Sequence, residues 1–172
     1  MKQILLFIVC LFGLGTMAVH AQENSEPADL ALYQQATKAI KDKEFLFKAN
    51  LYSGEKRYYN VSPTANYITL KDETVVMSFK SDAGTWAYEG KVKKFAVKED
   101  KKGNINLKMT IKTSYSTVIQ LNITIHKGSN HCVVVGNPIK YFDKFLLIGE
   151  LVPYDISNLV IPHVVLDNRV KK

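Results

Sequence analysis

The sequence predicts a mainly β protein, in which an antiparallel meander of about eight to ten strands forms a barrel or a sandwich and one short helix lies at the N-terminus. Three observations predict this fold. Apolar residues recur at every second position beyond residue 44, short polar turns separate these runs, and only residues 25–44 show a helical period. Short connections join neighbouring antiparallel strands, and closure into a barrel is favoured because it leaves no exposed edge.

Residues 1–21 are predicted to be a secretory signal peptide. An apolar run over 4–19 follows a lysine and leads into "VHA", which predicts cleavage after Ala21. The run has about 16 residues, whereas roughly 20 are needed to span a membrane. A lipoprotein signal is the alternative, but Cys10 follows Val9 rather than a small residue. We therefore expect a periplasmic or secreted protein with no transmembrane segment in the mature chain.

An N-terminal segment, 22–43, precedes the β domain and carries the predicted helix. Ser25 can cap this helix, and Pro27 is tolerated in its first turn. Tyr33 lies beside an apolar stripe that is expected to dock on the sheet. The stripe consists of Leu32, Ala36, Ala39 and Ile40.

The antiparallel β domain is expected to cover residues 44–153. Its alternation is clearest in "FLFKANL" (45–51), "INLKMTIK" (105–112) and "VIQLNITIH" (118–126), each of which puts its apolar residues on one side. In the first of these the predicted buried side is Phe45, Phe47, Ala49 and Leu51. Turn sequences separate the runs: "SGEK", "KDE", "KSDAG", "KEDKKGN" and "KGSN". Residues 154–172 are predicted to form a C-terminal arm or edge strand, because Pro162 excludes a central strand.

Charge and cysteine content limit the function classes. The chain carries 23 basic and 16 acidic side chains, and removal of residues 1–21 leaves 22 − 16, or +6. Such a charge favours either solubility or anionic partners such as lipid head groups, acidic glycans or nucleic acid. The lysine-rich "KVKKFAVKEDKK" (91–102) interleaves only Phe95, so nucleic acid is not expected. Its lysines are interpreted as a solvated hairpin arm that also blocks edge pairing, with Lys91, Lys93, Phe95 and Val97 on one face.

The stretch "IHKGSNHC" (125–132) raises the question of a metal site or a Cys–His pair. If 127–130 form a loop, His126 faces His131 across a hairpin on the outer side. Cys132 then points to the other face, because adjacent strand residues diverge. Zinc needs three or four ligands, and only His163 or a distant acid could add to the two histidines. We interpret the stretch as a hairpin turn and expect no metal, no cofactor and no disulfide.

No catalytic motif stands out, and the carboxylates lie mostly beside turns or on wet faces. The best candidate ligand-binding residues are aromatic. Trp86 and Tyr88 share one face of a short strand in "SDAGTWAYEG" (81–90), and Tyr58 or Tyr59, which point to opposite faces, could join them. Such side chains stack on sugars or cover an apolar ligand at a barrel mouth, although a core tryptophan is the simpler alternative.

The chain resembles a family of secreted Bacteroidetes proteins, domain of unknown function 4251, from about Ala39 to Leu151. The resemblance lies in "AIKDKEFLFKA", "NYITLKDETVVMSF", "YEGKVKKFAVKEDKKGNINLKMTIKT", "YSTVIQLNITIHKGSNHCVVV" and the later "LIGEL". It implies a compact lipocalin-like β fold and an envelope location, with no assigned activity and no catalytic residues.

These observations favour a non-enzymatic, exported, barrel-like domain that binds a small apolar or glycan ligand or an envelope partner. Trp86, Tyr88 and Tyr58 are the expected ligand contacts. Two alternatives stay open. One is an interaction or inhibitor-type module that uses its surface and the arm at 154–172, and the other is a hydrolase that acts on envelope polymers.

Overall fold

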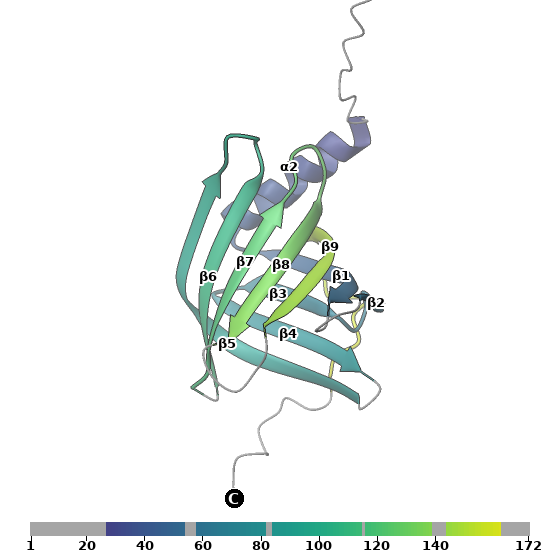
Figure 1. The fold of residues 1–172 in the computed structure, drawn as a ribbon, viewed down its shortest axis with the longest axis vertical. Helices are drawn as coiled ribbons and strands as arrows, with labels where there is room; N and C mark the ends of the chain where they lie inside the picture. The colour runs from purple at the N-terminus through teal and green to yellow at the C-terminus, as the bar shows by residue number, and fades with distance from the viewer. Residues whose placement is uncertain (1–26, 54–57, 82–83, 115, 139–143, 163–172) are drawn as a thin grey trace, which may run out of the picture.

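In the residues that the structure describes, the protein forms a closed antiparallel β-barrel of eight strands, with one further strand and one helix (Figure 1). The computed structural model describes residues 27–53, 58–81, 84–114, 116–138 and 144–162. The predicted signal peptide, Ser25 and residues 163–172 lie outside the described residues. Of the two architectures that the sequence allowed, the barrel is the one observed.

The strands follow one another around the barrel in chain order. Their bounds are β1 Phe45–Ser53, β2 Tyr58–Asn60, β3 Tyr67–Lys71, β4 Thr74–Ser81, β5 Gly84–Glu99, β6 Ile105–Thr113, β7 Val118–Ile125, β8 His131–Pro138 and β9 Phe145–Pro153. The barrel closes where β1 pairs with β9, from Phe45 opposite Pro153 to Ser53 opposite Leu146. β2 is the further strand, and it pairs with the end of β1 beyond the point where β3 pairs with it. This sequential pairing is the meander that the short turns predicted.

Helix α2 (Pro27–Asp42) covers one end of the barrel (Figure 1). It buries Ala36, Ala39 and Ile40 in the same cluster as the barrel core. The hydroxyl group of Tyr33 donates a hydrogen bond of 2.8 Å to the carbonyl oxygen of Gly103, in the turn between β5 and β6. Leu32 belonged to the predicted apolar stripe, but 39% of its surface is exposed. The buried face of the helix is therefore narrower than its sequence pattern indicated.

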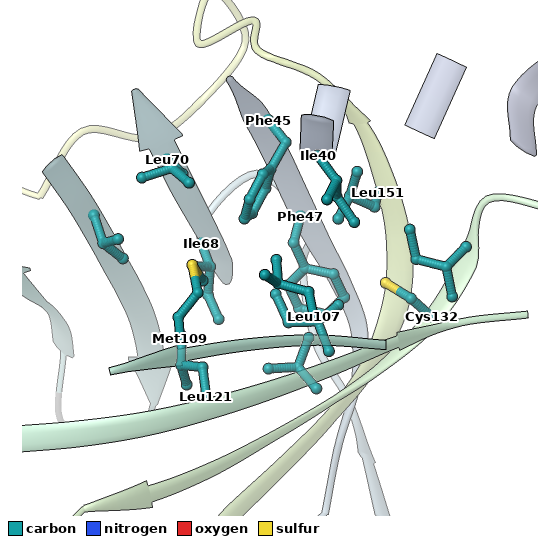
Figure 2. Close-up of a cluster of buried hydrophobic side chains, with 14 of the residues drawn as sticks. Ile40, Phe45, Phe47, Ile68, Leu70, Leu107, Met109, Leu121, Cys132 and Leu151 are labelled. Atoms are coloured by element: carbon teal, nitrogen blue, oxygen red, sulfur yellow. The ribbon is translucent and has the colours of Figure 1, made fainter. Parts of the chain in front are cut away.

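Side chains from opposite walls of the barrel meet in its interior (Figure 2). Phe45, Phe47 and Ile68 point from β1 and β3 toward Leu107 on β6 and the residues beside it. The largest of the fully buried side chains are Phe45, Phe47, Ile40, Leu46, Ile68, Leu70, Met77, Leu107, Met109, Ile111, Leu121 and Ile123. An eight-stranded barrel has an interior that side chains can fill or that can hold one small ligand. In the part of this barrel that the structure describes, side chains occupy the interior.

Two β-bulges interrupt the alternation of buried and exposed residues. One lies between Ala49 and Leu51 on β1, and the other lies between Val92 and Lys94 on β5. A bulge sets two residues against one on the partner strand, so the faces exchange beyond it. The prediction that Leu51 lies on the buried side was therefore wrong. Leu51 pairs with the exposed Ile148, and it is the next residue, Tyr52, that packs against the core.

The same correction applies to β5. Its predicted faces assumed strict alternation from residue 91 to residue 98, but the extra residue Lys93 shifts the register. Val92 and Phe95 consequently both pack against the core, although an unbroken strand would place them on opposite faces. Each bulge thus turns an aromatic side chain, Tyr52 or Phe95, toward the interior.

Leu46 is fully buried although it points away from the barrel interior. Its neighbours on β1, Phe45 and Phe47, belong to the interior cluster, whereas Leu46 does not. The described part of the C-terminal arm, 154–162, lies against this outer wall. The amide of Val160 donates to the carbonyl oxygen of Thr64 at 2.8 Å, and the hydroxyl of Tyr67 donates to the carbonyl oxygen of Val160 at 3.2 Å. We infer that the arm supplies the cover that Leu46 needs.

Candidate functional site

The end of the barrel opposite helix α2 carries a group of partly buried aromatic side chains. We call Tyr52, Phe79, Tyr88 and Phe145, together with Tyr59, the aromatic mouth. The rings of Phe79 and Phe145 have centroids 5.3 Å apart at an interplanar angle of 70°. Phe79 is on β4 and Phe145 is on β9, and these strands are separated by β3 and β1, so the contact crosses the barrel interior. Within the aromatic mouth, this pair therefore closes the barrel interior at this end.

Further ring contacts extend the mouth around the rim. The ring of Tyr88 meets that of Phe79 edge-on, with centroids 6.4 Å apart. The rings of Tyr52 and Tyr59 lie 6.5 Å apart, on strands β1 and β2. Edge-on and offset arrangements are the preferred geometries of aromatic pairs. Tyr59 is 51% exposed, so the rim offers aromatic surface to solvent.

The structure places the three aromatic residues predicted from the sequence as follows. Tyr88 is partly buried and packs against the core at the mouth. Trp86 is paired with Phe79 in the β4–β5 register, two residues from Tyr88, while its side chain lies outside the described residues. Tyr58 is paired with Ser53 and is 66% exposed. Of the two adjacent tyrosines on β2, it is Tyr59 that contacts Tyr52.

Sequence reasoning missed Phe79 and Phe145 as members of this group. Nothing in their local sequence separates them from the other core phenylalanines. The structure explains one feature of the Phe145 environment. A Cβ atom added at Gly136, its partner on β8, would lie 2.0 Å from the ring of Phe145, so a glycine is needed beneath that ring.

The stretch 125–132 is a hairpin turn, as predicted. β7 ends at Ile125, β8 begins at His131, and the amide of His126 donates to the carbonyl oxygen of His131 at 3.0 Å. Both histidines are exposed and Cys132 is buried on the other face. Burial raises the pKa of the Cys132 thiol, and Glu150 raises it further. The described residues contain no group of three or more His, Cys, Asp or Glu side chains that could hold a metal ion, and His163 lies outside them.

The comparisons with known proteins identify the fold. No protein-family model and no curated protein matches the chain. Among solved structures, the chain is similar to a DUF4251 family protein from Bacteroides eggerthii DSM 20697, with a TM-score of 0.64 and 24% sequence identity. The match covers 73% of this chain and 90% of that chain. The fold is therefore that of a DUF4251 family protein, which agrees with the resemblance found in the sequence. None of the helical residues that the structure describes forms a stretch long and apolar enough to cross a bilayer.

Proposed function

We propose that the chain is an exported member of the DUF4251 family, and that it works by binding a small apolar or glycan ligand at its aromatic mouth. One observation carries this proposal. Aromatic side chains that are only partly buried gather at one end of the barrel, whereas a helix covers the other end. Sugar rings and apolar groups both gain from contact with exposed aromatic faces.

The packing of the interior supports a ligand that lies on the mouth rather than inside the barrel. The Phe79–Phe145 contact crosses the interior, and fully buried side chains fill the space toward the helix. A ligand that entered would have to displace these side chains, and each large one contributes roughly 1.5–3 kcal/mol by its burial. Tyr59, Tyr88 and Trp86 are the proposed contacts, and Tyr58 extends the rim on its outer side.

The proposed signal peptide fits this role. Its cleavage after Ala21 would release a mature chain to the periplasm or beyond, where glycans and lipid-derived ligands are found. The N-terminal sequence of the protein recovered from the envelope or the medium tests this part. We expect Gln22 as the first residue.

The protein carries one tryptophan, and its strand position opposite Phe79 makes it a local reporter of the mouth. The experiment titrates the processed, exported protein with neutral oligosaccharides and with fatty acids while the emission of Trp86 is recorded. We expect a saturable change with one of the two ligand classes. Absence of a saturable response to both classes would refute binding at the mouth.

A pair of tyrosine variants tests the location. Tyr59→Ala removes an exposed ring of the mouth and should weaken binding about 2- to 12-fold, the equivalent of roughly 0.5–1.5 kcal/mol for an aromatic contact. Tyr154→Ala is the matched control, because Tyr154 follows β9 at the opposite end, where its ring lies 4.9 Å from the ammonium of Lys71. Its affinity should equal that of the unmodified protein.

A second candidate function is a protein-interaction module that works through the arm. Apolar side chains along 154–162 are exposed: Ile156 at 41%, Val160 at 50% and Ile161 at 67%. If the arm carries the function, substitution of Ile161 by serine should abolish co-purification of a partner from the native envelope, and Tyr59→Ala should not affect it.

A further inference from the structure

A pocket of about 230 Å3 lies where β6 ends and β5 continues toward the aromatic mouth. It is lined by Glu89, Gly90, Lys91, Lys93, Lys112, Thr113 and Ser114. Three lysines and one glutamate give the lining a formal charge of 3 − 1, or +2. We propose that this lysine pocket binds a phosphomonoester group, and that it does so independently of the aromatic mouth.

The arrangement of two of the lysines indicates an anionic ligand. Lys91 and Lys112 are directly opposite each other in the β5–β6 register, so their side chains leave the sheet on the same face. Like charges in this position destabilise a sheet. Among the residues that the structure describes, the ion pair within 4 Å is that of Lys38 with Asp42. The ammonium groups of Lys91 and Lys112 therefore have no carboxylate partner within that distance among these residues. An anion between them would turn a repulsive pair into an attractive site.

The β-bulge brings a third ammonium group to the same place. Lys93 is the extra residue of the bulge between Val92 and Lys94, and bulges often aim a side chain at a site. The ammonium of Lys91 donates a hydrogen bond to the hydroxyl of Thr74, which leaves its positive charge uncompensated. Ser114 is exposed and also lines the pocket, and it adds a neutral hydroxyl group that can donate to a phosphate oxygen. The hydroxyl of the buried Thr113 already donates to the carbonyl oxygen of Thr117 at 3.1 Å.

The charge and the volume of the pocket select the ligand class. A phosphomonoester carries about −1.5 to −2 at neutral pH, which matches the lining charge. The volume equals that of roughly eight water molecules at about 30 Å3 each. It is smaller than the roughly 300–1,000 Å3 of sites that enclose drug-sized ligands. The pocket therefore suits the phosphate and the first atoms of its carrier, while the rest of a sugar phosphate or of a lipid stays outside.

Calorimetric titration of the exported protein tests the proposal with inorganic phosphate and with glucose 6-phosphate, and glucose is the uncharged control. Co-sedimentation with phosphatidylcholine vesicles that contain or lack phosphatidic acid tests the lipid source. We expect binding of at least one phosphate compound and no binding of glucose at the pocket. Lys112→Gln should weaken that binding about tenfold, because it removes one charged hydrogen-bond donor.

Lys108→Gln is the matched control. Lys108 is exposed on the same strand and the same face as Lys112, but it does not line the pocket. Its substitution by glutamine removes the same charge. Its effect should stay below twofold. Binding of glucose 6-phosphate that depends on Lys112 supports a soluble carrier, and binding only to vesicles with phosphatidic acid that depends on Lys112 supports a lipid carrier. Equal losses in the two variants, or no binding of any phosphate compound, would overturn the proposal.

Discussion

The seam that closes the barrel depends on a glycine. Gly149 on β9 is paired with Ala49 on β1, next to the bulge in that strand. A Cβ atom at position 149 would lie 1.9 Å from the carbonyl oxygen of Lys48 and 2.9 Å from the Cα atom of Ala49. Both atoms belong to the backbone, so no side-chain rotation can relieve the contact. We therefore predict that Gly149→Ala forces β1 away from β9.

The size of the effect follows from these distances. Cβ atoms essentially never approach a non-bonded atom closer than 3.0 Å, so the strands must separate by at least 3.0 − 1.9, or 1.1 Å. A backbone hydrogen bond of about 2.9 Å would lengthen to about 4 Å and be lost. Loss of the two bonds nearest the contact costs roughly 1–3 kcal/mol each where the groups are buried. We expect a loss of about 2–6 kcal/mol for the two bonds together, from a total stability of about 5–15 kcal/mol.

Urea unfolding followed by far-ultraviolet circular dichroism measures this loss, and Gly136→Ala is the matched control. An added Cβ atom at Gly136 meets the ring of Phe145, a side chain that can move, so the expected cost is about 1–2 kcal/mol. The steric argument is refuted if Gly149→Ala unfolds within 0.5 kcal/mol of the unmodified protein, on the order of a surface substitution. It is also refuted if Gly136→Ala proves the more costly change.

Three further predictions concern the arm, the thiol and a turn. Leu46→Ala should lower the free energy of unfolding by about 2–5 kcal/mol in the intact chain and by clearly less after removal of 154–172. A double-mutant cycle based on urea unfolding measures the difference. Equal losses with and without the arm would show that the arm does not cover Leu46. Because burial raises the pKa of Cys132, its thiol should react with a disulfide reagent only in urea, and rapid labelling of the native protein would contradict this. Hydrogen bonds from Asn104 lower the pKa of Asp100, so its carboxylate stabilises the turn above its ordinary pKa. That contribution is lost as pH falls through the lowered value. The protection of the amides at 102–104, which is the exchange rate divided into the intrinsic rate at the same pH, should therefore fall there and not at higher pH.

The barrel could be predicted from the sequence because burial on one face of a strand leaves a period of two. In β6 the period is unbroken from Ile105 to Thr113, and the apolar residues that were predicted to share one side, from Ile105 to Ile111, are all buried. The prediction failed at the two bulges, since one extra residue at Asn50 or at Lys93 changes which face the later residues occupy. Each bulge is a feature of the pairing with one partner strand, β9 or β6, which the sequence of a single strand does not contain.

The candidate site was predictable only in part. Tyr88 could be found because it lies two residues from Trp86 in an aromatic stretch, although the strand predicted there as short is the 16-residue β5. Phe79 and Phe145 could not, because their contact joins two strands that are distant in the sequence and meet only across the closed interior. Leu46 illustrates the same limit. It is fully buried although strict alternation with Phe45 and Phe47 would place it on the solvent side, and we infer that the arm, more than a hundred residues later, covers it.

The aromatic mouth and the lysine pocket share strand β5, yet they can be tested separately. Tyr88 packs toward the barrel interior, and the next residue, Glu89, is exposed and lines the pocket. Adjacent residues on a strand point to opposite faces, so the strand itself separates the two sites. A change at Tyr59 should therefore leave phosphate binding intact, and a change at Lys112 should leave the response to neutral ligands intact. If either substitution abolished both activities, one shared site or a disturbed fold would have to replace the two-site interpretation.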